Sequence, residues 1–244
     1  MLRGKGLLTP IQYAFLRVFV DLPDQEQFYL AGGTALAEFY LGHRLSFDLD
    51  LFTAEPDLIL PFSYQVEAAC PPAGLQIEVT RRFASFVEFS VSQGVERLRV
   101  DLGLDTPVRF EPPVLSEYGV LVNGYQDQCV EKLLAYFGRA EPRDAVDLYF
   151  ILQEEALDDL STLAVQKDAG FDLYWLAVAL NQAAELPDEM ERWPVQMLAS
   201  FEPVVLKQKF QRLATELMSR VTDRGDTTTP RDMDREERRR SERE

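Results

Sequence analysis

Residues 47–52 read Phe-Asp-Leu-Asp-Leu-Phe, and this alternation of apolar and acidic residues constrains the fold more than any other segment. Successive side chains of a strand point to opposite faces, so Phe47, Leu49 and Leu51 face one way while Asp48 and Asp50 share the other face. Two carboxylates this close repel each other, and a divalent cation between them removes that cost. The segment predicts a strand that carries a metal site, with a strand face open to water as the alternative.

Gly32-Gly33-Thr34 forms a turn between a predicted strand and a predicted helix. Glycines let backbone N–H groups approach a phosphate closely, and a helix N-terminus adds a partial positive charge. Thr34 then binds a phosphate oxygen or caps the helix, and the alternative is a tight turn without a ligand. Thirteen residues separate Thr34 from Asp48, which is enough for one short helix and a return turn. The turn and the acidic strand are therefore expected side by side.

The Gly-Gly turn, the helix and the Asp-x-Asp strand resemble the DNA-polymerase-beta-like nucleotidyltransferase superfamily, and this resemblance implies a third carboxylate on a neighbouring strand. Residues 97–104 alternate, so Arg97, Arg99 and Asp101 share a face, and Asp101 is the candidate third ligand. Asp105 is the alternative and Glu88 a poorer one. Magnesium prefers oxygen ligands and shares its coordination shell with substrate phosphates, so Mg²⁺ is the expected metal, with Mn²⁺ as an alternative.

Two levels of resemblance follow from these motifs. A Gly-Gly turn, a helix and an Asp-x-Asp strand resemble the signature of the DNA-polymerase-beta-like nucleotidyltransferase superfamily. More narrowly, Gly-Gly-Thr-x-Leu followed by His43-Arg44-Leu-Ser46-Phe-Asp-Leu-Asp-Leu-Phe resembles the AbiEii/AbiGii toxin family, which includes the MenT toxins. Two later segments, residues 131–135 and residues 143–148, match further motifs of that family. Together the matches span residues 30–152.

The resemblance implies a metal-dependent nucleotidyltransferase that moves a nucleoside monophosphate from an NTP to an acceptor hydroxyl and releases pyrophosphate. It implies a toxin of a type IV-like toxin–antitoxin or phage-defence system, with the tRNA 3′ end as acceptor and a cognate antitoxin as protein partner. By position, Lys132 would bind the triphosphate, and Asp147 or Asp144 would be essential at the site.

The motifs and the resemblance together predict the residues of the active site. The metal ligands are Asp48, Asp50 and Asp101. The catalytic residues are Asp48, Asp50, Asp101, Lys132 and Asp147. The nucleotide-binding residues are Gly32, Gly33, Thr34, Arg44, Ser46, Lys132 and Asp144. His43 contacts the nucleotide or anchors its turn. The alternatives are a surface lysine at Lys132 and a surface ion-pair ladder of Asp144 and Asp147 with Arg139 and Arg143.

The net charge of −16 disfavours a general nucleic-acid binder, because such a surface repels polyanions. It favours the first alternative function, a same-fold transferase that modifies a small molecule or a protein. A basic groove near Arg81, Arg82, Arg97, Arg99 and Arg139 would instead favour RNA. The second alternative is a catalytically decayed nucleotide-binding or interaction protein.

The predicted fold class is α+β, with a mixed sheet of about five strands flanked by helices and followed by a helical C-terminal half. Residues 1–124 would form the nucleotidyltransferase core, and residues 125–221 a helical region that completes the active site. Residues 222–244 would be a charged tail, disordered or a frayed helix. The predicted strands are residues 28–31, 47–52, 76–80, 86–91 and 97–104. The predicted helices are residues 10–20, 34–41, 58–70, 126–137, 142–152, 157–169, 171–185 and 193–221, the last with breaks at its prolines.

Two cysteines and one histidine cannot build a typical structural zinc site. No segment reaches the roughly 18 apolar residues that a membrane span needs, and the N-terminus lacks the pattern of a signal peptide. The sequence therefore predicts a cytoplasmic protein without a membrane partner.

Overall fold

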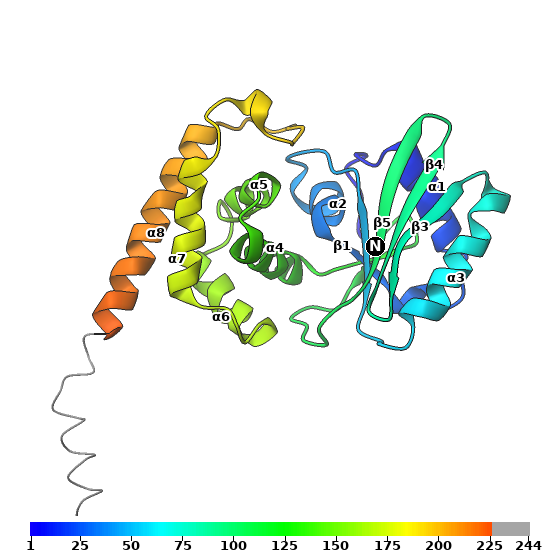
Figure 1. The fold of residues 1–244 in the computed structure, drawn as a ribbon, viewed down its shortest axis with the longest axis horizontal. Helices are drawn as coiled ribbons and strands as arrows, with labels where there is room; N and C mark the ends of the chain where they lie inside the picture. The colour runs from blue at the N-terminus through cyan, green and yellow to red at the C-terminus, as the bar shows by residue number, and fades with distance from the viewer. Residues whose placement is uncertain (226–244) are drawn as a thin grey trace, which may run out of the picture.

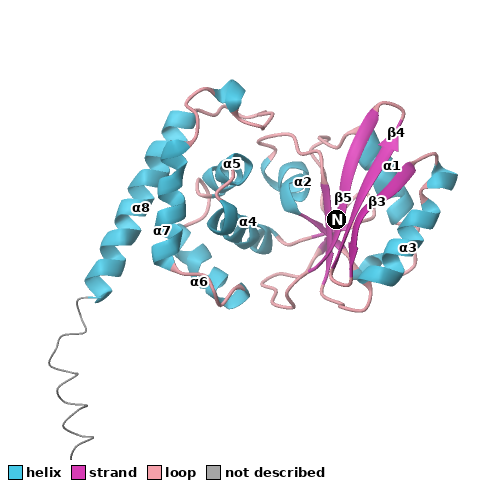
Figure 2. Ribbon diagram, in the orientation of Figure 1, coloured by secondary structure: helices cyan, strands magenta, loops and turns pink. Residues whose placement is uncertain are grey.

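The computed structural model describes residues 1–225, which form a sheet-containing half and a helical half (Figure 1). Strands and helices gather in different parts of the molecule, as the colours of Figure 2 show, and the predicted α+β class is confirmed. The helices are α1 (Pro10–Phe19), α2 (Gly32–Ala35), α3 (Ile59–Ala69), α4 (Tyr125–Arg139), α5 (Pro142–Ile151), α6 (Leu157–Lys167), α7 (Leu173–Gln182) and α8 (Pro203–Gly225). The strands are β1 (Tyr29–Ala31), β2 (Leu49–Thr53), β3 (Gln76–Phe83), β4 (Phe86–Gln93), β5 (Glu96–Leu104), β6 (Val114–Leu115) and β7 (Leu121–Val122).

The sheet of the described chain has seven strands in the order β3-β4-β5-β2-β1-β7-β6, so the prediction of about five was wrong. The two strands that sequence reasoning missed, β6 and β7, are two residues long each. A two-residue segment is too short to show the alternation by which a strand is predicted. The site depends on the centre of the sheet, where β2 pairs with β1 antiparallel and with β5 parallel.

The apolar face of the sheet packs against α1 and α3, which lie on one side of it (Figure 1). Phe62 of α3 stacks on Phe28 with ring centroids 4.2 Å apart and meets Phe19 of α1 edge-on at 5.4 Å. Leu49 and Leu51 of β2 are fully buried in this core, as the alternation predicted, whereas Phe47, predicted for the same face, lies before β2 and is exposed. The acidic side chains of β2 therefore face the opposite side, toward the helical half.

Helix α4 is central to the helical half and packs against α5, α6 and α7, while α8 lies along α7. Their shared core includes the fully buried residues Leu133, Tyr136, Leu176 and Phe210. The prediction of a helix from residue 193 was wrong, because α8 begins only at Pro203. Residues 193–202 instead return to the acidic strand.

This return segment pairs its backbone with the turn before β2. The Leu45 N–H donates to the Gln196 carbonyl, and the Leu198 N–H donates to the His43 carbonyl. Proline disfavours helical geometry in the residue before it, so Pro194 and Pro203 keep the segment extended. The consequence is a direct connection between the helical half and the turn that carries Arg44.

Helix α2 continues into a π-helical stretch, Leu36–Leu41, where a single helix over residues 34–41 was predicted. Within residues 1–225, no helix combines the length and apolar character that crossing a bilayer requires. The prediction of a charged tail falls mostly on residues 226–244, which lie outside the described residues.

Candidate active site

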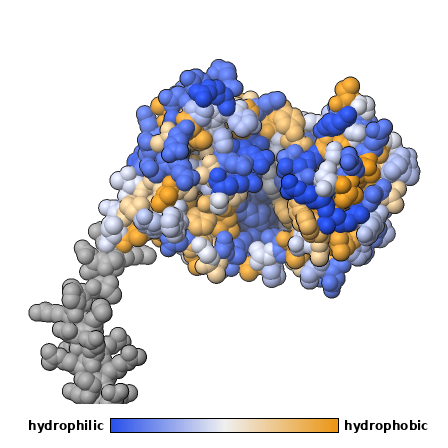
Figure 3. All heavy atoms as spheres, viewed as in Figure 1, coloured by the Kyte–Doolittle hydropathy of each residue, from blue (hydrophilic) through white to orange (hydrophobic). Residues whose placement is uncertain are grey.

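The acidic face of β2 meets an acidic residue of β5. Asp50 and Asp101 are Cα partners on these two parallel strands, and Asp48 lies just before β2. All three line a cavity of about 600 Å³ between the two halves of the molecule. In Figure 3 the surface is hollowed between the halves, and the rim of this hollow is hydrophilic. The three carboxylates that the sequence singled out thus line one cavity.

The environment of the acidic pair favours a bound cation. Burial raises the pKa of Asp50 against the opposing pull of Lys132, and the charge of Asp48 adds to the rise. Burial, followed by the charge of Asp50, raises the pKa of Asp101 to about 7. One oxygen of Asp101, Oδ1, is buried and has no hydrogen-bond partner among the residues that the structure describes. A divalent cation would relieve both the repulsion and the unpaired oxygen.

The other two candidates for the third carboxylate are placed less favourably. Asp105 accepts a hydrogen bond from the Tyr29 hydroxyl at 2.5 Å and pairs with Arg109 at 3.2 Å. Glu88 lies opposite Asp101 on β4, but its carboxylate accepts from the Thr80 hydroxyl. The register of β2 and β5 therefore favours Asp101.

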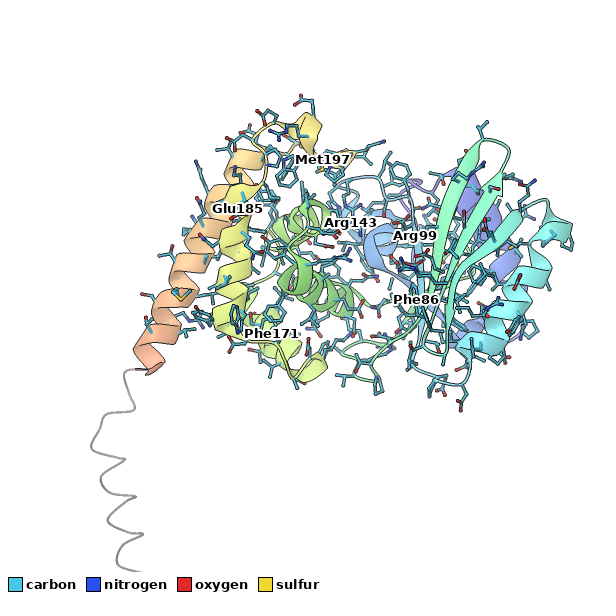
Figure 4. The ribbon with its side chains drawn as sticks, in the orientation of Figure 1. Phe86, Arg99, Arg143, Phe171, Glu185 and Met197 are labelled. Atoms are coloured by element: carbon cyan, nitrogen blue, oxygen red, sulfur yellow. The ribbon has the colours of Figure 1, made fainter. Side chains whose placement is uncertain are left out.

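Arg99 lies among the carboxylates. Its Nη2 is 2.9 Å from Asp48 Oδ2, and its Nε is 3.5 Å from Asp101 Oδ2. Arg143 Nη1 approaches the same oxygen of Asp48 to 3.7 Å, and Figure 4 shows the two arginines near each other between the halves. Within residues 1–225, no three acidic, His or Cys side chains converge into a complete ligand set. Magnesium retains waters and takes substrate phosphates as ligands, so such a site needs only one or two carboxylates.

The Gly-Gly turn fits closely around the acidic strand. Gly32 has φ +68°, and a Cβ there would collide with the Asp50 carboxylate. A Cβ on Gly33 would come within 2.6 Å of Arg44 Nη2 and 2.8 Å of Ser46 Oγ. Gly33 lines the cavity, so its backbone is available to a ligand. Both glycines are therefore required by close approach, which explains the motif physically.

Thr34 positions the acidic strand. Its side chain is buried, and its hydroxyl donates at 2.5 Å to the carbonyl of Asp48. Gln12, which sequence reasoning missed, donates from Nε2 to the carbonyls of Ser46 at 3.0 Å and Asp48 at 3.3 Å. Gln12 also closes the capping box of α1 with Thr9, and that local pattern gave no signal of its second role.

Asp147 of α5 is fully buried and holds three basic side chains. Arg44 makes a bidentate ion pair with it, from Nε to Oδ1 at 2.7 Å and from Nη2 to Oδ2 at 2.8 Å. Lys132 Nζ lies 2.7 Å from Oδ2. His43 Nε2 is 2.7 Å from Oδ1, and burial lowers the pKa of this imidazole, so the neutral ring donates. Burial alone raises the pKa of Asp147, but Lys132 and Arg44 outweigh it and hold that pKa well below the usual range. Asp147 is therefore not part of a surface ladder, and it fixes the position of Lys132.

Asp144 fixes the position of Arg139, as Asp147 does for Lys132. It is fully buried, and it accepts two hydrogen bonds from Arg139, from Nε at 2.6 Å and Nη2 at 2.9 Å. Arg139 and Arg143 both line the cavity. The carboxylates of α5 thus hold cationic side chains and leave those cations to face the cavity.

The charges that line the cavity differ from those of the whole chain. Its cationic lining residues are Arg44, Arg99, Lys132, Arg139 and Arg143, against the acidic residues Asp48, Asp50 and Asp101. The chain as a whole carries a net charge of −16. The return segment closes one side with Trp193, Pro194, Val195 and Gln196. The excess of cationic side chains in this lining suits a polyanionic ligand.

Three features of this site are those of a nucleotidyltransferase. They are paired carboxylates on a sheet, a glycine turn packed against them, and a lysine from the helical half. The model of the nucleotidyl transferase AbiEii toxin family, a type IV toxin–antitoxin family, matches residues 14–223. The chain belongs to this family and is a nucleotidyltransferase, which confirms the predicted family and enzyme class.

Individual relatives show a sequence match and two similar folds. The chain is 27% identical over 186 residues to an uncharacterized protein of Aquifex aeolicus, covering 72% of this chain and 82% of that protein. The crystal structure of JHP933 from Helicobacter pylori is similar in fold, with a TM-score of 0.53 and 17% identity over 88% of this chain and 91% of that one. MenT4, a nucleotidyltransferase toxin of Mycobacterium tuberculosis, gives a TM-score of 0.51 and 15% identity over 85% of this chain and 82% of that one.

Proposed function

We propose that this enzyme transfers a nucleoside monophosphate from an NTP to an acceptor hydroxyl in a metal-dependent reaction. The supporting observation is the Asp50–Asp101 pair in a cavity that Lys132 enters from the helical half. Residues 1–124 contribute the carboxylates and the glycine turn, and residues 125–221 contribute the lysine and two arginines. Both parts are therefore needed for one active site.

Different residues of the site have different roles in the reaction. Asp48, Asp50 and Asp101 would hold divalent cations, preferably Mg²⁺, which when bound neutralise phosphate charge and lower the pKa of a hydroxyl. Lys132 and the backbone of Gly33 bind the triphosphate and stabilise the charge that develops on leaving pyrophosphate. Asp101 also assists removal of the proton from the acceptor hydroxyl.

The proposed acceptor is the 3′ end of a tRNA. Arg139 and Arg143 line the cavity, and an RNA end bears the phosphates that such side chains bind. A local basic cavity on an acidic chain admits the end of an RNA while the rest of the surface repels it. With this acceptor the enzyme acts in the cytoplasm as a toxin, neutralised by an antitoxin protein, and phage defence is a proposed use of such a system.

A second candidate is transfer to a small molecule or a protein hydroxyl at the same site. The net charge of −16 favours it, because an acidic surface repels RNA at long range. Both candidates share the metal, the NTP and the leaving pyrophosphate, so they differ only in the acceptor.

Incubation of the full chain with Mg²⁺, each α-labelled NTP and total tRNA separates the candidates. Label on RNA with the wild type, absent with Asp48→Ala, is the result expected for the tRNA acceptor. Label on protein or on a small molecule added from a cell extract favours the second candidate. Asp57→Ala is the matched control, because this exposed aspartate lies outside the cavity. No label on any acceptor, with NTP binding absent, contradicts nucleotidyl transfer.

A further inference from the structure

A second cavity, of about 260 Å³, adjoins the first and shares Asp50, Phe52, Lys132 and Arg139 with it. Its remaining wall includes Gln128 and Glu131 of α4 and Asp105, which follows β5. Since one water takes roughly 30 Å³ of liquid, this volume corresponds to about nine waters. It is large enough for one planar base.

Gln128 is the unusual residue of this wall. The residue is fully buried, and neither its Nε2 nor its Oε1 has a hydrogen-bond partner in the described protein. A buried polar group without a partner is costly and rare, and it calls for a functional explanation. The amide presents a donor and an acceptor side by side, which matches the edge of a nucleobase. The last torsion of glutamine is broad, so the amide can turn toward a ligand.

Two planar side chains are available for stacking in this cavity. Phe52 packs its ring directly over Gly103, where any Cβ would collide with it, so the ring is held in place. The guanidinium of Arg139 is fixed by its two hydrogen bonds to Asp144. Aromatic rings and guanidinium planes are the surfaces on which proteins stack bases.

The acidic residues of the wall select among ligands. The Asp105 carboxylate accepts from Tyr29 and Arg109, and the Glu131 carboxylate accepts from Lys167 at 2.8 Å. Carboxylate oxygens accept hydrogen bonds, so this wall favours a ligand that donates. An exocyclic amino group donates two hydrogens, whereas the edge of uracil offers a single N3–H donor between two carbonyl oxygens.

We propose that the second cavity binds the base of the NTP and that Gln128 reads its edge in favour of bases with an exocyclic amino group. This inference rests on the proposed function, because it needs the triphosphate at Lys132. Lys132 lines both cavities, which places the triphosphate in the first and the base in the second. The base of a bound acceptor has the same chemistry but no triphosphate to place it here.

The test measures equilibrium binding of the α,β-methylene analogues of ATP, CTP, GTP and UTP to the full chain with Mg²⁺. Inorganic tripolyphosphate serves as the probe of the phosphate site alone. In the wild type, the UTP analogue binds at least tenfold more weakly than the best of the other three. In Gln128→Met this difference falls below threefold, while tripolyphosphate affinity is unchanged. The Tm is not lowered, because methionine fills a similar volume and removes two unpaired polar atoms.

A second variant tests the same cavity in case Gln128→Met fails to fold. Ala135→Leu narrows the second cavity from another part of its wall and weakens all four analogues without affecting tripolyphosphate. Equal binding of the four analogues by the wild type, or an unchanged preference in Gln128→Met, overturns the inference and leaves the proposed function standing. A wild type that binds neither the analogues nor tripolyphosphate overturns the proposed function as well.

Discussion

Lys132 of α4 and Asp147 of α5 form an ion pair of 2.7 Å, in which the carboxylate is fully buried and the lysine lines the active-site cavity. Arg44, from the turn before the acidic strand, shares the same carboxylate. One buried residue therefore connects the glycine turn, the acidic strand and the helical half. Asp147 is a positioning residue, since it acts through Lys132 and Arg44.

Asp147→Asn leaves Lys132 and Arg44 without their counter-charge. Removal of one partner from a buried ion pair costs about 3–5 kcal/mol of stability, because the remaining charges are uncompensated. In conditions where the variant stays folded, we expect kcat to fall roughly 100-fold through misplacement of the lysine. Denaturant titration and steady-state kinetics measure the two effects.

Asp144→Asn is the matched control for that variant. It also removes a buried carboxylate from α5, but its partner Arg139 is half-exposed and Lys132 keeps its own partner. We expect a smaller loss of stability, with KM for the NTP raised more than kcat is lowered. Equal effects of the two variants on kcat would contradict the assigned role of Asp147.

Gly32→Ala tests the close fit of the turn. The residue has φ +68°, and the new Cβ meets the Asp50 carboxylate. We expect a stability loss of about 1–2 kcal/mol from the left-handed backbone and a large loss of transfer activity from displacement of Asp50. Gly74→Ala is the control, since Gly74 has φ +80° with nothing within 4 Å of its Cβ. Gly74→Ala should lose stability through the same left-handed backbone conformation, and its transfer activity should match that of the wild type.

Arg99 competes with the metal for Asp48 and Asp101. Its replacement in Arg99→Met removes an ion pair worth ~1 kcal/mol at a half-exposed position, so Mn²⁺ affinity should rise about fivefold or more. Isothermal titration with Mn²⁺ measures this directly. Arg97→Met is the control, because Arg97 lies two residues away on the same face and, within residues 1–225, donates only to backbone carbonyls. A gain in both variants would show a general charge effect.

The pKa of Asp101, near 7, makes stability depend on pH when no metal is present. Between about pH 4, the pKa of an unfolded aspartate, and pH 7, the folded chain binds more protons than the unfolded chain. The free energy of unfolding therefore falls as pH rises through this window and levels off above it. Asp101→Asn should flatten the fall and be more stable than wild type at pH 8 by about 1–3 kcal/mol.

Denaturation with a chelator at pH 5, 6, 7 and 8 measures that prediction. Mg²⁺ should restore stability to the wild type at pH 8, because binding to the folded state alone stabilises it, and should have less effect on Asp101→Asn. Part of the fall should remain in the variant, since burial also raises the pKa of Asp50. Identical pH profiles for wild type and variant would contradict the assignment.

Local patterns predicted the parts of the site that lie on regular elements. Alternation placed Asp48 and Asp50 opposite Leu49 and Leu51, and it also selected Asp101, which the register of β5 then brought beside Asp50. Strand alternation is a two-residue period, so it can be read from the chain directly. These features needed no knowledge of tertiary structure.

The remaining features depend on contacts that sequence patterns do not encode. The ion pair between Arg44 and Asp147 joins residues 103 positions apart, and the Gln12 contact with Asp48 joins residues 36 apart. The helix predicted from residue 193 failed because that segment satisfies its backbone by pairing with residues 43–45. Contacts between residues far apart in the sequence therefore outweigh the local propensity to form a helix.

The position of the label that reaches the acceptor tests nucleotidyl transfer most directly. The full chain is incubated with Mg²⁺, the preferred acceptor and the same NTP labelled either at the α- or at the γ-phosphate. Nucleotidyl transfer predicts that the α-label enters the acceptor while the γ-label leaves as pyrophosphate, and that Asp50→Asn abolishes both. A γ-label on the acceptor, or transfer that persists in Asp50→Asn, would contradict the assignment of the reaction to this site.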